Sequence, residues 1–446
     1  MMKISEMPKY DDYVDSGVEW LGRVPSHWQI IRLKNTINGC VNGLWGADPN
    51  GKDELVVVRV SDFDEQKLNV SDEKLTYRSI PENERKSRLL KFGDLLIEKS
   101  GGGDKTLVGR VVLFDKSYTA VTSNFVAKMT PKNWVNHSFL KYVFFSLYSR
   151  GVNYVSIKQT TGIQNLDANS YLNEVFCFPD EFVQAEVANF LDKKTAQIDD
   201  AIAIKEQQIS LLKERKQIII QQAVTQGLDP NVPMKDSGVD WIGKIPAHWD
   251  IVPGFTVFKE GKDSNKGMIE SQVLSLSYGN VIIKPEEKLV GLVPESFETY
   301  QIALPGDIII RCTDLQNDKT SLRTGIVRNK GIITSAYLNL RLKTEHSAEF
   351  MHYFLHVLDI TKTIYRFGSG LRQNLSYKDF KHMRILMPPK AEQIEIVNYI
   401  NNQVEVTESS IDLIKNKIEK LKEYKTTLIN SAVTGKIKIT PEMVEQ

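Results

Sequence analysis

The sequence predicts an α+β fold in which two repeated β-rich domains alternate with two long helices that pair as an antiparallel coiled coil about a pseudo-twofold axis. Three observations lead to this fold class. A fourteen-residue motif occurs twice, shorter segments follow in the same order in both halves, and each half ends in a long seven-residue apolar repeat. We expect the β-rich domains at 1–180 and 231–389, the first long helix at 181–230, and the second long helix with a tail at 390–446.

The motif that opens each half is DSGVEWLGRVPSHW at 15–28 and DSGVDWIGKIPAHW at 236–249. Nine of its fourteen positions are identical in the two copies, and the other five exchange similar side chains. Self-similarity of this kind indicates that the chain is built from two copies of one structural unit. Because Trp buries a large apolar ring, we expect the Trp residues of this opening motif to lie in each domain's core.

Each half then carries the same order of shorter segments. A strand after a Gly-Asp turn comes first, followed by a half-buried strand, an amphipathic helix, a polar glycine loop and a last strand before proline. The repeated order predicts that both domains have the same plan. The segments are 93–97, 122–129, 139–145, 161–166 and 175–179 in the first half, and 306–310, 334–341, 350–356, 369–375 and 384–388 in the second.

The long helices are predicted from their apolar spacing. Alternate steps of four and three residues from Ala188 to Ala223 meet apolar residues at eight of eleven positions, and the same steps from Val397 to Ala432 meet nine of eleven. A strict seven-residue seam over more than four heptads is typical of a coiled coil, whereas a helix resting on a globular core shows a broader stripe. Two helices with matching seams in one chain are each other's expected partners.

Charge is distributed unevenly although the net charge is only +1. The segment 116–166 has six Lys or Arg residues and no acid, and 319–344 repeats this pattern in the second half. One such segment is equally well explained as a solvated surface, but two at matching places favour a surface that faces a polyanion such as DNA. If the two domains read one duplex about a dyad perpendicular to its axis, helices lying along that duplex must run antiparallel.

Catalytic motifs are not found. SGGGDKTLVGR at 100–110 resembles a phosphate loop, but Asp104 stands where the glycine before Lys-Thr is required. His352 and His356 have the spacing of a zinc pair, but Tyr353 occupies the Glu position of HExxH. The three Cys residues form no CxxC pair, and no apolar run is long enough for a membrane span. We therefore expect no catalytic residue, no metal site, no membrane partner and a cytoplasmic protein.

Taken together, the motifs resemble a known family. Both halves carry the opening motif, the GD(L/I)(L/I)I strand, a P…Q.E…N(F/Y)(L/I) helix start and an LKE.K segment, and the chain has SAVTGK at 431–436. This tandem arrangement resembles the specificity subunit of type I restriction–modification systems over nearly the whole chain. The first copy departs from it with QAVTQG at 222–227, which has Gln where the second copy has Gly.

The resemblance implies a non-catalytic reader of double-stranded DNA that recognises a bipartite, asymmetric site. Each β-rich domain would be a target-recognition domain for one half-site, and the helices would hold the domains apart. Two methyltransferase subunits would use S-adenosylmethionine to methylate adenine, and restriction subunits would use ATP and Mg²⁺ to translocate and cut DNA. No cofactor is implied for this chain itself.

Two other functions stay open at this point. A self-contained restriction enzyme or DNA methyltransferase would need catalytic motifs, although the scattered acids of nucleases are hard to recognise in a sequence. A coiled-coil scaffold with two protein-binding domains would leave the two acid-free segments unexplained.

The resemblance and the basic segments together suggest residues that contact DNA. Arg and Gln suit bidentate contacts to guanine and adenine, whereas Lys, Ser and Thr suit phosphates. Gln164 and Gln373, which are equivalent in the repeat, have loop shaping as an alternative role. The DNA-binding candidates are Lys99, Ser100, Lys105, Arg110, Lys158, Gln159, Thr160 and Gln164 in the first domain, and Arg311, Thr313, Asn317, Lys319, Arg323, Arg366, Arg372 and Gln373 in the second.

The helix ends suggest a surface for partner subunits. The tripeptide AVT occurs near the end of both long helices, beyond what the apolar seam requires. Capping of each helix by the glycine that follows, Gly227 or Gly435, is the alternative explanation. The candidates for subunit binding are Ala223, Val224, Thr225, Ala432, Val433 and Thr434.

Overall fold

The computed structural model describes residues 3–103, 106–160, 162–285, 287, 296–312, 322–343, 345–367 and 375–445. The chain divides into two compact units. Unit 1 comprises Met1–Glu206 and Lys415–Gln446, and unit 2 comprises Gln207–Ile414. Each unit therefore contains one β-rich domain together with a part of both long helices.

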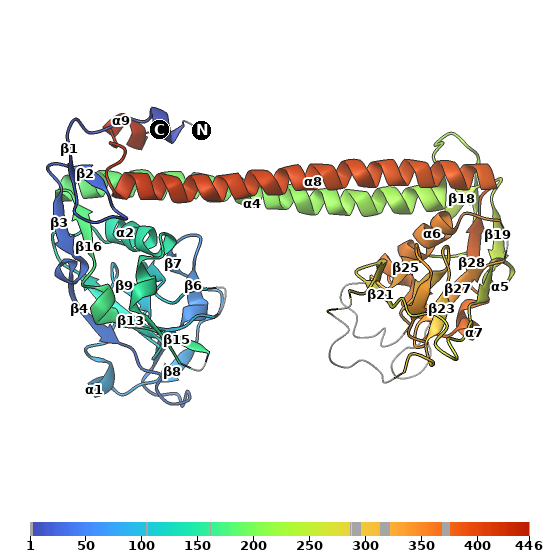
Figure 1. The fold of residues 1–446 in the computed structure, drawn as a ribbon, viewed down its shortest axis with the longest axis horizontal. Helices are drawn as coiled ribbons and strands as arrows, with labels where there is room; N and C mark the ends of the chain where they lie inside the picture. The colour runs from blue at the N-terminus through green and yellow to red at the C-terminus, as the bar shows by residue number, and fades with distance from the viewer. Residues whose placement is uncertain are drawn as a thin grey trace. The chain divides into compact units, whose positions relative to one another are not determined.

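The β-rich domain of unit 1 is built around a six-stranded sheet (Figure 1). The strand order is β4-β13-β9-β11-β7-β6, and all neighbours are antiparallel except β11 and β7. Smaller sheets, β12-β5-β8, β10-β15-β14, β16-β3 and β1-β2, surround it. The strands are β1 (Tyr13–Asp15), β2 (Arg23–Pro25), β3 (Gln29–Arg32), β4 (Ile37–Asn42), β5 (Glu54–Val58), β6 (Phe63–Asp64), β7 (Asn69–Val70), β8 (Tyr77–Ser79), β9 (Leu95–Glu98), β10 (Ser100–Gly101), β11 (Val111–Leu113), β12 (Ala120–Thr122), β13 (Val126–Pro131), β14 (Ile157–Thr160), β15 (Ile163–Leu166) and β16 (Val175–Phe178).

One amphipathic helix, α2 (His137–Ser149), packs on this domain. The Asn136 side chain caps it by accepting a hydrogen bond from the Phe139 amide, which satisfies one of the free N–H groups of the first turn. Its buried face includes Phe139, Leu140 and Val143. The shorter helices of unit 1 are α1 (Glu82–Arg85), α3 (Ala168–Tyr171) and the 3-10 helices Ile4–Glu6, Leu33–Thr36, Val60–Asp62 and Val152–Ser156.

The domain of unit 2 repeats this plan with a four-stranded sheet, β20-β27-β24-β25. Its helix α6 (Ala348–Ile360) is capped by Ser347 in the way that Asn136 caps α2. The described residues confirm the predicted order of the strand after the Gly-Asp turn, the second strand, the helix and the last strand in both halves. The polar glycine loop predicted at 161–166 is wrong in part, because Ile163–Leu166 forms β15, and most of its counterpart at 369–375 lies outside the described residues. The remaining elements are β17 (Met234–Asp236), β18 (Lys244–Pro246), β19 (Asp250–Pro253), α5 (Gly254–Val257), β20 (Phe258–Glu260), β21 (Leu274–Ser277), β22 (Asn280–Ile283), β23 (Gln301–Ala303), β24 (Ile308–Ile310), β25 (Thr324–Ile326), β26 (Gly331–Ile333), β27 (Leu338–Leu342), the 3-10 helix Thr363–Phe367, α7 (Tyr377–Phe380) and β28 (Arg384–Met387).

The two long helices are α4 (Glu181–Gln226) and α8 (Lys390–Val433), and they pack together. In unit 1, Asp199 of α4 pairs with Lys425 of α8, whereas in unit 2 Lys216 of α4 pairs with Glu408 of α8. Because a later residue of α4 meets an earlier residue of α8, the helices run antiparallel, as predicted. The predicted seam is buried in unit 1 at Leu191, Ile198, Ile202, Ile418 and Leu428, and in unit 2 at Ala223, Val397, Ile400 and Ile411.

The end of each long helix docks on one copy of the opening motif. In unit 1, Gly435 follows α8 with a positive φ of 67°, and a side chain there would meet Pro25 at 2.5 Å. In unit 2, Gly227 follows α4 with a φ of 76° and lies against Pro246 and Trp249. Trp28 and Trp249 are buried, which confirms the core role predicted for them, whereas Trp20 and Trp241 of the same motif are half-buried. The motif therefore occurs twice because each copy forms a socket for one helix end.

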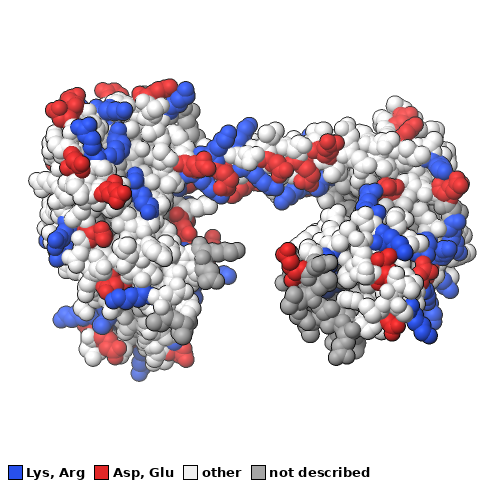
Figure 2. Space-filling model, in the orientation of Figure 1, with Lys and Arg blue, Asp and Glu red and all other residues white. Residues whose placement is uncertain are grey.

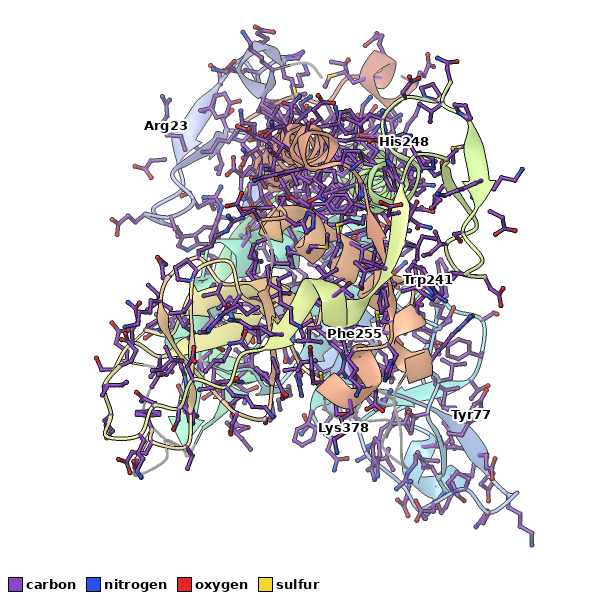
Figure 3. The ribbon with its side chains drawn as sticks, turned by 90° about the vertical axis from the view of Figure 1, so that its right-hand side faces the viewer. Arg23, Tyr77, Trp241, His248, Phe255 and Lys378 are labelled. Carbon is purple, nitrogen blue, oxygen red and sulfur yellow. The ribbon has the colours of Figure 1, made fainter. Side chains whose placement is uncertain are left out.

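Further contacts strengthen both sockets. In unit 2, Glu392 near the start of α8 accepts hydrogen bonds from the Trp249 indole at 3.0 Å and contacts His248 Nε2 at 2.8 Å. Figure 3 shows His248 beside the long helices, which are seen end-on. In unit 1, the tail after α8 buries Ile437 and Ile439 and ends in the short helix α9 (Pro441–Glu445). The tail is thus part of the core of unit 1.

Within the described ranges, no helix has both the length and the apolar character of a membrane span. The same residues contain no group of three or more His, Cys, Asp or Glu placed to hold a metal ion. Cys177 and Cys312 are buried and Cys40 is half-buried, and all three are free thiols.

Candidate nucleic-acid interface

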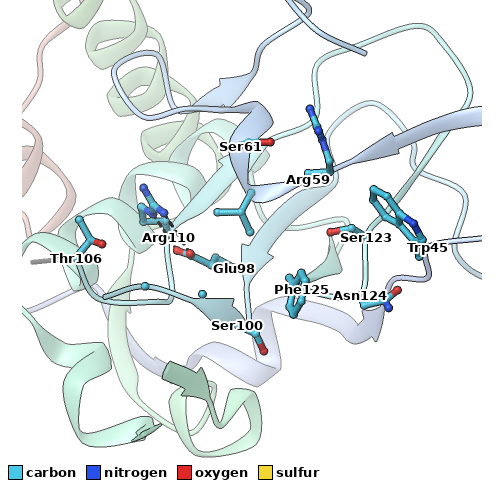
Figure 4. A pocket seen from close by; sticks show the side chains of 13 residues that line it. Trp45, Arg59, Ser61, Glu98, Ser100, Thr106, Arg110, Ser123, Asn124 and Phe125 are labelled. Carbon is cyan, nitrogen blue, oxygen red and sulfur yellow. Dashed lines mark hydrogen bonds and ion pairs between the residues drawn. The ribbon is translucent and has the colours of Figure 1, made fainter. Parts of the chain in front are cut away.

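An open cavity of about 710 Å³ lies in the domain of unit 1 (Figure 4). It is formed where β9 and β10 end, where β11 begins and where the loop before β13 turns. We call this cavity the hollow. Its lining residues are Trp45, Arg59, Val60, Ser61, Glu98, Ser100, Gly101, Gly102, Thr106, Arg110, Ser123, Asn124 and Phe125.

A buried ion pair forms one wall of the hollow. Arg110 donates from Nε to Glu98 Oε2 at 2.9 Å and from Nη2 to Glu98 Oε1 at 3.2 Å (Figure 4). Its Nη1 contacts Glu65. Glu98 is fully buried, and this burial raises its pKa to about 7 against the opposing effect of a backbone hydrogen bond from Arg110. A guanidinium carries five N–H donors, so Arg110 can still donate to an acceptor in the hollow.

Two glycines keep the hollow open. A side chain at Gly101 would come within 2.9 Å of Glu98 Oε1, and one at Gly102 within 2.7 Å of Gln164 Oε1. Gln164 is buried behind this loop, where it accepts from the Val108 amide at 3.1 Å and donates to the Gly103 carbonyl at 3.2 Å. Gln164 therefore shapes the loop, which was the alternative role considered for it.

Aromatic and polar side chains at the rim suit contacts with bases. Phe125 is 55% exposed and Trp45 is 37% exposed, which is unusual for such large apolar groups. Arg78 stacks over the Trp45 ring at 4.7 Å, and the buried hydroxyl of Ser123 has no hydrogen-bond partner among the described residues. Exposed aromatic rings can contact thymine methyl groups or stack on unpaired bases.

These rim residues were missed by the sequence analysis. The segment TSNF at 122–125 was interpreted only as part of an alternating strand, but β13 begins at Val126. The available signal was a polar–polar–aromatic run at a strand boundary, which is where loops carry binding residues.

The other candidates of the first domain are placed as follows. Lys99 donates to Asn42 Oδ1 at 2.8 Å, and the Ser100 hydroxyl donates to Asn165 Oδ1 at 2.6 Å. Lys158 and Gln159 are exposed on β14, where Lys158 contacts Asp167 at 2.8 Å. Thr160 ends β14, and Lys105 lies outside the described residues.

In the second domain, Arg311 is exposed and stands at the position equivalent to Glu98. The Glu98 amide donates to the Arg110 carbonyl at 2.9 Å, and the Arg311 amide donates to the Arg323 carbonyl at the same distance. Equivalent places in the two domains therefore carry an acidic side chain in one and a basic side chain in the other.

The other second-domain candidates are placed as follows. Arg323 is buried and donates from Nη1 to the Arg311 carbonyl at 3.2 Å, while its amide donates to Asp359 at 2.6 Å. Arg366 is exposed in the 3-10 helix Thr363–Phe367. Thr313, Asn317, Lys319, Arg372 and Gln373 lie outside the described residues.

The six candidates for subunit binding are buried within the chain. Ala223, Val224 and Thr225 are at most 6% exposed, and Ala432, Val433 and Thr434 are fully buried. Both Thr hydroxyls donate to the carbonyl four residues earlier in their helix. These side chains hold the helix ends in their sockets and form no exposed surface, so a partner at either end would contact the residues around them.

Several side chains of the basic segments are paired with acids. Lys141 pairs with Asp192, Arg328 with Glu349, and Arg341 with both Asp263 and Asp307. The acids come from other parts of the sequence, which is why segments without acids looked unpaired. On the face seen in Figure 2, Lys and Arg side chains lie among Asp and Glu side chains.

Exposed apolar residues follow a second heptad spacing on the long helices of unit 2. Leu211 and Ile218 on α4 are 56% and 46% exposed, and Tyr399, Val406 and Leu413 on α8 are 40%, 56% and 63% exposed. Members on each helix are seven residues apart, so they share one face of that helix. We call these five residues the outer stripe. An outward apolar stripe of this kind is typical of a surface that packs against another helix.

No family model matches the chain. Relatives in sequence include a protein assigned as the type I restriction enzyme MjaX specificity subunit of Methanocaldococcus jannaschii, which is 20% identical over 444 residues, or 94% of this chain and 96% of the relative. The type I restriction enzyme StySPI specificity subunit of Salmonella potsdam is 22% identical over 446 residues, or 93% of this chain and 90% of the relative.

Solved structures show the same fold. The HsdS subunit from Thermoanaerobacter tengcongensis matches with a TM-score of 0.53 at 15% identity, covering 93% of this chain and 98% of its own. A chain from a type I R-M system, solved for its complex assembly and conformational transition, matches with a TM-score of 0.60 at 15% identity, covering 92% and 98%. The chain thus has the HsdS fold and is similar, over nearly its whole length, to type I restriction enzyme specificity subunits, which confirms the resemblance that its motifs indicated.

Proposed function

We propose that the chain is the DNA-sequence specificity subunit of a type I restriction–modification system. The main support for the proposal is that the chain is similar in sequence, over nearly its full length, to type I restriction enzyme specificity subunits. Its fold is also that of solved HsdS structures. The two β-rich domains support it, because they share one plan yet differ in charge at the equivalent positions Glu98 and Arg311. Each domain recognises one half of a bipartite site in double-stranded DNA.

The chain itself is non-catalytic in this proposal and takes no cofactor. Two methyltransferase subunits bring S-adenosylmethionine and methylate adenine at the site that this chain selects. Restriction subunits bring ATP and Mg²⁺ for translocation and cleavage. The complex works on DNA in the cytoplasm.

The long helices bind the methyltransferase subunits through exposed side chains. The outer stripe supports this, because five large apolar residues on two helices would otherwise face water. The buried AVT segments support it only indirectly, by fixing the helix ends.

The test uses the full chain together with the methyltransferase subunit encoded beside it. Adenine methylation is mapped genome-wide in cells that carry both proteins, and in cells that carry the methyltransferase subunit alone. We expect methylation at one bipartite sequence, and only when this chain is present. DNA binding of the purified chain, titrated with salt, completes the test, since phosphate contacts weaken as salt rises.

Two outcomes would overturn the proposal. Methylation or cleavage of DNA by the purified chain alone would make it an enzyme. Absence of DNA binding at low salt, with methyltransferase binding intact, would make it a scaffold.

A further inference from the structure

A lysine in the helix seam of unit 1 connects the helices to the β-rich domain. Lys425 is 8% exposed and donates to both carboxylate oxygens of Asp199 at 2.7 Å. Its third contact is the backbone carbonyl of Gln66, at 2.6 Å. An ammonium has three donors, so these contacts use all of them. Gln66 lies in the loop between β6 and β7, and the two long helices and this loop are thus joined at one atom.

The loop that Lys425 holds is fixed from within. Asp64 Oδ1 accepts from the Gln66 amide at 3.0 Å and from the Lys67 amide at 2.9 Å, and Leu68 closes the loop with a φ of 57°. The loop is therefore rigid, and a displacement of Gln66 also moves the neighbouring residues of the loop.

Glu65 in the same loop contacts Arg110, the guanidinium that lines the hollow. Arg110 is held on its other side by the buried carboxylate of Glu98. A continuous set of polar contacts therefore runs from the helix seam through Lys425, the loop and Glu65 to the wall of the hollow. The position of Arg110 depends on where the helices hold the loop.

Unit 2 contains the same ion pair, and its described residues show no such connection. Lys216 and Glu408 stand 209 residues from Lys425 and Asp199 respectively, and they pair in the same way. The hairpin tip at Tyr278, which occupies the place of the β6–β7 loop, lines a cavity of about 360 Å³ together with Lys216. Among the described residues, the Lys216 ammonium has Glu408 as its hydrogen-bond partner, and no backbone carbonyl of the hairpin takes the role of Gln66.

We propose that Lys425 is a positioning residue for base recognition by the first domain. It holds the β6–β7 loop against the helices, and Glu65 of that loop holds Arg110 in the geometry needed to read one base pair. This inference rests on the proposed function. It also makes the first half-site sensitive to the state of the helix pair, where the methyltransferase subunits bind, whereas no such link is present in the part of unit 2 that the structure describes.

The test compares Lys425→Met with the matched control Lys216→Met. Both remove one seam lysine from one ion pair, and Met keeps the length and apolar character of the side-chain stem. Discrimination at every base pair of both half-sites is measured by genome-wide methylation mapping with the methyltransferase subunit, and by binding of the purified chain to duplexes with single base changes. We expect Lys425→Met to reduce discrimination about tenfold at one base pair of the first half-site. Lys216→Met should leave that half-site unchanged.

Two further variants separate positioning from loss of fold. Glu65→Gln changes an exposed side chain, so the chain should fold, and we expect the same relaxation at the same base pair. In the Glu65→Gln background, Lys425→Met should add no further loss there. Lys425→Arg, which keeps the charge and the donors, should restore most of the discrimination.

Equal losses at both half-sites in Lys425→Met would show a merely structural role and overturn the inference. So would full discrimination in Glu65→Gln. A wild-type chain that directs no sequence-specific methylation would instead contradict the proposed function, and the two failures are therefore distinguishable.

Discussion

At the scale of single residues, Glu98 gives the first domain a pH-dependent stability. Burial raises its pKa from the ordinary 4.5 to about 7, so the folded chain keeps this proton where the unfolded chain has lost it. Its stabilising contribution is therefore full below about pH 4.5 and is lost as the pH rises through about 7. In Glu98→Gln this contribution cannot titrate.

The measurement is urea unfolding of Glu98→Gln and wild type at a series of pH values, since their difference cancels all other titrating groups. We expect the advantage of wild type over the variant to shrink from about pH 4.5 to 7. An advantage that grows with pH would mean that the ion pair with Arg110 outweighs burial.

The glycines after the long helices are a second residue-scale prediction. Gly435→Ala would place a carbon 2.5 Å from Pro25 at a φ of 67°, whereas the nearest atom at Gly227 is the end of the Glu392 side chain at 3.1 Å. The left-handed conformation alone costs roughly 1–2 kcal/mol for alanine. Gly435→Ala should therefore lower the free energy of unfolding by more than this, and Gly227→Ala by about this amount. Equal losses in chemical denaturation would show that Pro25 moves freely.

The roles and contacts of single residues were the hardest features to predict from the sequence. The polar glycine loop predicted at 161–166 was wrong in part, because Ile163–Leu166 forms β15. The alternative role of Gln164 was predictable from its equivalence to Gln373 in the repeat. The acidic partners of Lys141, Arg328 and Arg341 could not be predicted, because these acids are distant in sequence and meet the basic residues only in the folded domain. The rim position of Phe125 likewise depends on where β13 begins.

At the scale of elements, the outer stripe predicts how the methyltransferase subunit binds. Leu211→Ser removes a large apolar side chain from the stripe, while Lys213→Ser changes an exposed residue that points about 200° away on the same helix. We expect Leu211→Ser to weaken co-purification of the methyltransferase subunit and Lys213→Ser to leave it unchanged. Both should keep the wild-type unfolding midpoint, because neither residue belongs to the seam.

If Leu211→Ser and Leu413→Ser together leave co-purification intact, the outer stripe is not the binding surface. Removal of the residues after Leu428 is a poor alternative test. That segment contributes Ile429, Val433 and Ile437 to the core of unit 1, and its loss would unfold the unit.

Elements were predicted well where their pattern is local. The heptad seam of the long helices depends on residues within a few turns of one helix. Sheet order was not predictable, because the parallel pairs β11–β7 and β12–β5 join strands that are far apart in sequence.

At the scale of the whole molecule, the fold class was predictable from the sequence. Few folds are compatible with both an internal duplication and a heptad seam in each half. Each half has one domain, one helix and one socket. In unit 1 the socket of the first domain receives the second helix, and in unit 2 the socket of the second domain receives the first helix. Because each helix ends at the domain of the other half, the two helices run antiparallel.

The last prediction concerns the gap between the half-sites, which we expect the helices to set. Four residues inserted near Glu206 add about one turn to α4, or roughly 6 Å of rise, which is close to two base-pair steps of about 3.4 Å. Coiled coils absorb such an insertion by local unwinding. A single insertion, however, lies between Asp199 and Lys216, so the two ion pairs with α8 can both survive only if the added turn bulges out.

A matched second insertion near Lys415 of α8, 209 residues from Glu206, lengthens both helices and lets both ion pairs form. The doubly inserted chain should therefore keep both half-site sequences while the spacer grows by about one or two base pairs. The single insertion should give a smaller change or lower activity. Genome-wide mapping of methylated adenines reads the half-sites and the spacer at once. An active double variant with the original spacer would show that the helices do not set the gap, and altered half-sites would show that they also shape the reading surfaces.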